Sequence, residues 1–250
     1  MRIKQAIENL NYQDTREFFK KRAKKFREDN PYSVTMYQDN NEKIVKERNQ
    51  KEIEKLKPML CLDWESRVLD VACGIGRWAD AIQENIQEYC GVDFSGELIE
   101  IANKRNTKRQ RYAFYEGSVI EIDKVLEENH KGTYNVVLMI GIFMYINDDD
   151  MLSAIRQIIA RCEADATVCI REPIGVTERL TLKDFFSEEL DDTYNAIYRT
   201  REEFASCFEE TFLKCGFVIE KEGFMFEEKE LNNRAETEQY YYILRRHANV

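Results

Sequence analysis

The pattern of hydrophobic and polar positions changes character near Arg67. Residues 1–58 are polar and charged with helical spacing, which Asn30-Pro31 interrupts because the residue before a proline disfavours helix. From Arg67 onward, short β-rich runs alternate with amphipathic helical stretches, an order that predicts a parallel sheet covered by helices. The predicted strands are 67–72, 88–94, 112–117, 134–141 and 166–172. The predicted helices lie near 77–87, 95–106, 149–161 and 200–215.

Two late runs, FVIEKEGF (217–224) and QYYYILRR (239–246), predict a hairpin-type addition at one edge of the sheet. The pattern as a whole predicts an α/β fold in which 1–58 form a helical lid. Residues 59–250 then form the main domain, with an insertion at about 173–208. Ligands of such sheets bind beyond the carboxyl ends of the strands, so residues at those ends are the candidates for function.

Composition and charge narrow the class of protein. The net charge of −10 over 250 residues disfavours a nucleic-acid partner, because an acidic surface repels phosphates. The seven cysteines form no CxxC pair, and no cluster of histidine and carboxylate has ligand spacing, so we expect neither a disulfide framework nor a bound metal. The N-terminus has no apolar signal region and no stretch is long enough to span a bilayer, which predicts a cytoplasmic protein without a membrane partner.

The strongest motif is VLDVACGIGRWADAI (68–82), in which a strand leads through glycines into a helix. Gly74 permits a tight turn, and Gly76 lets the backbone approach a ligand. Free N–H groups at the start of the following helix can bind a negative group. Ala79 completes a GxGxxA pattern, but any glycine-rich turn gives that pattern, so it is weak evidence alone.

Two aspartates make the motif more specific. Asp93 ends the second strand, 17 residues after Gly76, where its carboxylate can accept hydrogen bonds from two ribose hydroxyls. Asp70 lies inside the first strand, at a position where a dinucleotide dehydrogenase needs no charge. The alternative is that Asp70 only braces the loop and Asp93 is an exposed residue in a turn, but the joint spacing of the two favours a role in ligand binding.

The segments LDVACGIGRWADAI, GVDFSGELIEIAN, GSVIEI and YNVVLMIGIFMYI resemble, in order, the motif set of class I S-adenosylmethionine-dependent methyltransferases. The resemblance covers about residues 66–172. It implies a Rossmann-like, seven-stranded, mostly parallel sheet with helices on both faces and an antiparallel last strand. It also implies S-adenosylmethionine as the cofactor.

The resemblance also assigns the cofactor-binding residues. Asp70, Gly74 and Gly76 would surround the methionine part, Asp93 the ribose, and Ile140 to Ile142 would form the floor beside the sulfonium. The other residues assigned to the cofactor are Ala72, Trp78, Phe94, Ser95, Ser118, Val119, Gly141, and, from the lid, Tyr37 and Arg48. Many relatives carry Asp where Ser118 stands, so this chain lacks that strong acceptor for the adenine amino group.

Candidates for catalysis lie near the ends of the fourth and fifth strands. Methyl transfer is a displacement that depends mainly on alignment, although a hydroxyl acceptor also benefits from a base. Glu172 and Tyr145 are the candidate bases, because His130 and His247 are expected at the wrong end of the sheet and in the tail. The alternative role of Glu172 is an ion pair with Arg171 or a loop contact.

The insertion is rich in tyrosine and arginine, which suits a polar, anionic small molecule, although these side chains can equally pack on the core. The candidate acceptor-binding residues are Tyr32, Arg171, Tyr194, Tyr198 and Arg199. The stretch REPIGVTERLTLKDF…YNAIYRTREEF is similar to methyltransferases of capsule and lipopolysaccharide sugar pathways.

The sequence therefore predicts a methyltransferase of a small polar, anionic acceptor, such as a nucleotide sugar, a sugar phosphate or a capsule precursor. The alternatives are N-methylation of a metabolite or a protein terminus, and a non-catalytic S-adenosylmethionine-binding protein. A dehydrogenase is disfavoured by Asp70 and by the absence of a YxxxK pair. The missing Asn-Pro-Pro-Tyr and Pro-Cys loops favour a small molecule over nucleic acid, and the oligomeric state stays open.

Overall fold

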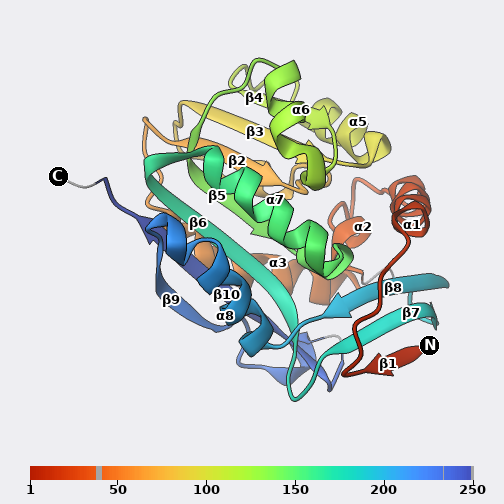
Figure 1. Ribbon diagram of the computed structural model, residues 1–250. Coiled ribbons are helices and arrows are strands. Elements are labelled where there is room, and N and C mark those ends of the chain that lie inside the picture. Colours follow the sequence, from red (N-terminus) through yellow and green to blue (C-terminus); the bar gives the residue numbers. More distant parts are fainter. Residues whose placement is uncertain (38–40, 233, 249–250) are drawn as a thin grey trace.

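The computed structural model describes residues 1–37, 41–232 and 234–248, and a seven-stranded sheet runs through its centre (Figure 1). Its strand order is β4-β3-β2-β5-β6-β10-β9, and only β10 runs antiparallel to its neighbours. The strands are β2 (Arg67–Val71), β3 (Glu88–Asp93), β4 (Tyr112–Glu116), β5 (Tyr134–Ile140), β6 (Cys162–Gly175), β9 (Val218–Phe224) and β10 (Thr237–Arg246). The predicted sheet is confirmed, and so is the late pair of strands at its edge.

Helices cover both faces of this sheet, as the alternating pattern predicted. The central strands are buried on both sides, which explains their nearly continuous apolar runs. One face packs against α6 (Ile122–Glu128), α7 (Asp148–Ala160) and α8 (Arg201–Glu210). The other face packs against α3 (Glu42–Leu56), α4 (Arg77–Ala81) and α5 (Gly96–Arg105). The sequence missed α6 and extended α4 too far, to residue 87.

The N-terminal region is helical as predicted, with a break around Asn30-Pro31, but it contains three helices where the sequence predicted two. These are α1 (Tyr12–Lys24), α2 (Ser33–Met36) and α3, and the side chain of Asn11 caps the first of them. Along the described residues, no helix is both long and apolar enough to cross a membrane.

The predicted insertion is a hairpin. Residues 173–175 extend β6, and α8 belongs to the main domain, so β7 (Leu180–Ser187) and β8 (Asp192–Tyr198) form the added part. An unpredicted strand, β1 (Arg2–Lys4), pairs with β7 and completes a second, three-stranded sheet. Figure 1 shows this small sheet below α1, which packs against β8. The N-terminal region and the insertion therefore form one layer over the end of the large sheet.

A buried ion group joins α3 to α4 and β6. One carboxylate oxygen of Glu52 lies 2.5 Å from Nη2 of Arg77, and the other lies 2.8 Å from Nε of Arg171. Burial opposes ionisation of Glu52, but Arg171 and Arg77 outweigh that effect and hold its pKa below the usual value. Glu52 therefore pairs with two guanidiniums and offsets one of their two positive charges.

We expect Glu52→Ala to lower the free energy of unfolding by about 3–5 kcal/mol, because it leaves two buried cations without their counter-ion. The matched control is Glu54→Ala on the same helix, an exposed position where the change should stay within about 0.5 kcal/mol. Urea unfolding of the three proteins measures both differences. Equal stability of the two variants would show that this ion group does not stabilise the packing of α3.

Candidate functional site

A cavity of about 360 Å³ lies at the carboxyl ends of β2, β3 and β5. Ten of the predicted cofactor and catalytic residues line it: Tyr37, Ala72, Gly74, Asp93, Phe94, Ser118, Val119, Ile140, Gly141 and Tyr145. One face of α1 closes it with Tyr12, Thr15, Arg16 and Phe19, which the sequence analysis did not single out. Their spacing of three to four residues places them on one face of a helix, and this spacing is the signal in the sequence that could have identified them.

The glycine loop between β2 and α4 is bound to the end of β3. The N–H of Gly74 donates to Oδ2 of Asp93 at 2.9 Å. Gly74 has a φ of +56°, and a Cβ there would lie 2.9 Å from Cγ2 of Thr35, so a larger residue would push against α2. Ala72 adopts a φ of +61°, which is rare for a residue with a side chain. The loop is therefore a closely fitted wall of the cavity.

Asp93 has capacity left for a ligand. Besides the N–H of Gly74 it accepts the N–H of Ser95, at 2.9 Å on Oδ1, and its side chain is buried. Burial raises the pKa of Asp93 to about 6, although both N–H donors act against this shift. Each carboxylate oxygen can accept two hydrogen bonds, so one acceptor position on each remains for a ligand in the cavity.

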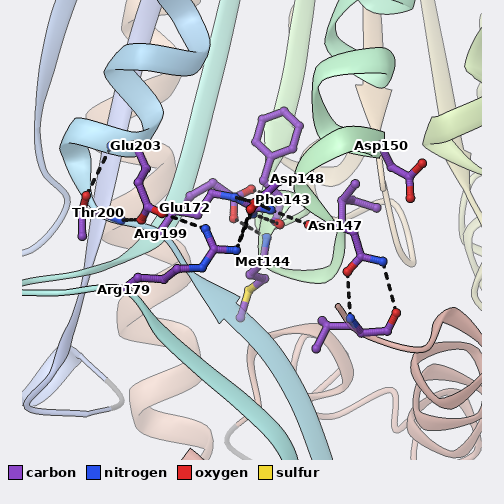
Figure 2. Close-up of polar contacts among 12 residues, drawn as sticks. Phe143, Met144, Asn147, Asp148, Asp150, Glu172, Arg179, Arg199, Thr200 and Glu203 are labelled. Carbon is purple, nitrogen blue, oxygen red and sulfur yellow. Dashed lines mark hydrogen bonds and ion pairs between the residues drawn. The ribbon is translucent and has the colours of Figure 1, made fainter. Parts of the chain in front are cut away.

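Glu172 binds the loop after β5 (Figure 2). This fully buried carboxylate accepts the N–H groups of Ile142 at 2.6 Å, Phe143 at 2.9 Å and Met144 at 3.3 Å. Burial raises the pKa of Glu172 to about 7, and the three amides and Arg171 oppose that shift. The carboxylate therefore fixes the backbone of the loop and does not face the cavity.

Arg199 binds the same loop through its backbone carbonyls (Figure 2). Its guanidinium donates to the carbonyls of Phe143 at 2.6 Å and Ile146 at 2.7 Å and pairs with Asp148. Arg179 also binds Asp148, and it reaches Glu203 on α8 at 2.8 Å. Arg199 therefore connects the inserted hairpin to the loop and to α7, and Arg179 connects it to α7 and α8.

A second, smaller cavity of about 80 Å³ shares Thr35, Tyr37, Ile140 and Gly141 with the first. Its further walls include Arg48, Glu52, Arg171, Tyr194 and Tyr198. Arg48 is 5% exposed, and within the described part of the chain its Nε has no hydrogen-bond partner. Burial lowers the pKa of Arg48, so an anion beside it would stabilise the charged form. Among the described residues, no group of three or more metal-ligating side chains is placed to hold an ion.

Residues 68–165 match the family model described as a methyltransferase domain. This segment of the chain is a methyltransferase domain. The matched segment contains the glycine loop, Asp93 and the loop after β5, and so it contains most of the larger cavity. No protein with curated annotation matches the chain in sequence.

Solved structures of methyltransferases share the fold of the whole chain. Phosphoethanolamine N-methyltransferase 1 of Haemonchus contortus is 15% identical with a TM-score of 0.66, over 96% of this chain and 51% of that one. An S-adenosylmethionine-dependent methyltransferase of Leishmania major is 15% identical with a TM-score of 0.62, over 91% and 82% of the two chains. Magnesium protoporphyrin IX methyltransferase of Synechocystis is 12% identical with a TM-score of 0.61, over 96% and 100%. They confirm the predicted Rossmann-like class I fold.

Several residues that the sequence analysis assigned to the cofactor do not line the larger cavity. The hydroxyl of Tyr89 donates to Asp70, whose pKa is raised to about 7 by burial, so Asp70 braces the sheet. Gly76 packs toward Asn106 and Phe114, and neither Gly76 nor the buried Trp78 lines either cavity. Ser95 caps α5 through the N–H of Leu98.

The assignments on the acceptor side need larger corrections. Arg199 lines neither cavity, because its guanidinium donates to backbone carbonyls of the loop after β5. Tyr32 points away and donates to Asp80 at 2.9 Å. Glu172 is unsuited as a base because its oxygens hold backbone amides. Arg171, Tyr194 and Tyr198 do line the smaller cavity.

We expect Glu172→Gln to lower the free energy of unfolding by about 1–3 kcal/mol, because the new NH₂ group faces the N–H of Met144 or Phe143. The affinity for S-adenosylhomocysteine should fall as the loop shifts. Glu128→Gln, at an exposed position on α6, is the control and should change neither property. A Glu172→Gln protein that keeps normal stability and affinity but loses turnover would instead support the base.

Proposed function

We propose that the domain methylates a small, polar, anionic acceptor, such as a sugar phosphate, a nucleotide sugar or a capsule precursor. The observation that carries this proposal is the pair of cavities that meet at Tyr37 and Gly141. The larger cavity has the walls that a nucleoside needs, and the smaller one is lined by guanidiniums and phenols. A methyl group held at their junction would face an acceptor across a short distance, and such alignment supplies most of the catalysis.

The adenosine of the cofactor fits the larger cavity. Asp93 offers its remaining acceptor positions to the ribose hydroxyls, and Phe94 provides an aromatic wall beside them. Ser118 and Val119 lie further along the same cavity, where they suit the adenine. Bound there, S-adenosylmethionine supplies a methyl group on a positively charged sulfur.

Arg48 suits the carboxylate at the methionine end of the cofactor. Its guanidinium is buried at the smaller cavity, which shares Ile140 and Gly141 with the cofactor cavity. Burying the charge of Arg48 is costly, and a ligand carboxylate would offset that cost. Arg171, Tyr194 and Tyr198 are then left for the acceptor.

The assignment of Asp93 predicts a pH-dependent affinity. Ionised Asp93 accepts both ribose hydroxyls, whereas the protonated acid loses one acceptor position. Because its pKa is about 6, affinity for S-adenosylhomocysteine should be full at pH 7.5 and should fall toward pH 5. Asp93→Asn should weaken binding at pH 7.5 by about 1.5–3 kcal/mol and should remove this pH dependence. Calorimetry at several pH values measures both, and a variant that keeps the wild-type profile contradicts the assignment.

The assignment of Arg48 predicts a difference between two ligands. Arg48→Met should weaken S-adenosylhomocysteine binding by about 1.5–3 kcal/mol, the range for a hydrogen bond to a charged group. Methylthioadenosine has the same nucleoside but no carboxylate, so its affinity should not change. Lys46→Met, at an exposed position on the same helix, controls for the lost charge. Equal weakening of both ligands would mean that Arg48 supports the cavity without binding the carboxylate.

A further inference from the structure

Four tyrosine hydroxyls form a chain along the boundary of the two cavities. The oxygens of Tyr37 and Tyr145 are 2.6 Å apart, and those of Tyr145 and Tyr194 are 3.1 Å apart. Tyr198 donates to Tyr194 at 3.4 Å, and Nη1 of Arg234 donates to Tyr198 at 3.3 Å. Tyr37 and Tyr145 line the larger cavity, whereas Tyr37, Tyr194 and Tyr198 line the smaller one.

The hydrogen bonds among the four tyrosines leave one hydroxyl proton without an acceptor within the group. The four hydroxyls carry four protons, and their three mutual bonds use three of them. Tyr198 uses its proton on Tyr194, so the remaining proton belongs to Tyr37, Tyr145 or Tyr194. All three side chains line a cavity. A ligand that fills the site and excludes water must therefore offer this proton an accepting atom, or a buried donor stays unsatisfied.

Among the described residues, the cavity walls offer no free base to a neutral nucleophile. Of the carboxylates near the junction, Asp93 accepts two backbone amides, and Glu52 pairs with two arginines. The remaining carboxylate on the walls, Glu121, is exposed and lies next to the adenine end. Burial raises the pKa of the tyrosines at the junction, which makes them poor bases at neutral pH. Within the described residues, neither cavity has a histidine in its wall.

We propose that the methylated atom is an anionic oxygen of a carboxylate or a phosphate group. This inference rests on the proposed methyl transfer and specifies its acceptor. The free phenol proton and Arg171 hold one oxygen of the anion, while a second oxygen attacks the methyl carbon. The carbon–sulfur bond breaks, its electron pair neutralises the sulfonium, and the products are a methyl ester and S-adenosylhomocysteine. No proton is released, so the step needs no base.

The nature of the bond that forms tests this directly. The full-length enzyme receives S-adenosylmethionine with a tritiated methyl group, together with glucuronate, glucose 6-phosphate, glucose or glucosamine, or with a small-molecule extract of the source cells. Methyl carboxylates release labelled methanol in mild alkali. Methyl phosphodiesters survive alkali and are recognised by their ³¹P signal, whereas ethers and methylamines survive and contain no such phosphorus.

Label in an ester or a phosphodiester is the expected result, and which of the two it is identifies the anion. Label only in ethers or methylamines, or no labelled oxyanion product from any source, overturns the inference. Label in ethers or methylamines would still agree with the methyltransferase proposal. That proposal fails separately if the enzyme does not bind S-adenosylmethionine or transfers its methyl group to nothing.

A variant tests the role of the tyrosine chain. Tyr194→Phe interrupts the chain, so kcat/KM for the labelled acceptor should fall at least about tenfold while cofactor Kd stays within about twofold. Tyr242→Phe is the matched control, because this buried tyrosine lies on β10 and its hydroxyl has no hydrogen-bond partner within the described residues. If Tyr194→Phe behaves like Tyr242→Phe, with the same Tm and the same kcat/KM, the chain does not hold the acceptor.

Discussion

The architecture of the site depends on one buried carboxylate and the three backbone amides that it binds. Glu172, near the end of β6, fixes residues 142–144, and the same loop supplies Gly141, Ile142, Tyr145 and Ile146 to the larger cavity. Hydrogen bonds to a charged acceptor are the strong ones, and burial removes competing water. Without this support the loop would be ordered only when a ligand binds, and its loss of conformational entropy would then weaken binding.

Arg199 extends the same constraint to the inserted hairpin. It follows β8 directly, yet its guanidinium lies on the carbonyls of the loop after β5. Tyr194 and Tyr198, on β8, are thereby placed relative to Gly141, where the two cavities meet. The hairpin and the main domain are consequently fixed relative to each other at the point where the two cavities meet.

Local signals in the sequence were enough for the sheet and for two residues of the larger cavity, whereas most of its other predicted residues came from the family resemblance. Gly74 and Asp93 were predicted because a strand, a turn and a helix start fix their positions within a few residues. The sequence could not show that Arg171 reaches the smaller cavity whereas Arg199 turns to the loop, because partners far away in the chain decide where each guanidinium goes. The pairing of β1 with β7 and the meeting of four tyrosines are equally nonlocal.

Hydrogen exchange at the amides of Ile142, Phe143 and Met144 tests the central claim most directly. If Glu172 organises the loop before any ligand arrives, these amides should exchange in the cofactor-free protein only about as fast as the core strands, which require global opening. Adding S-adenosylhomocysteine should then slow them no more than it slows the core. Fast exchange that becomes slow only when S-adenosylhomocysteine binds would contradict the account, because the ligand and not Glu172 would then order the loop.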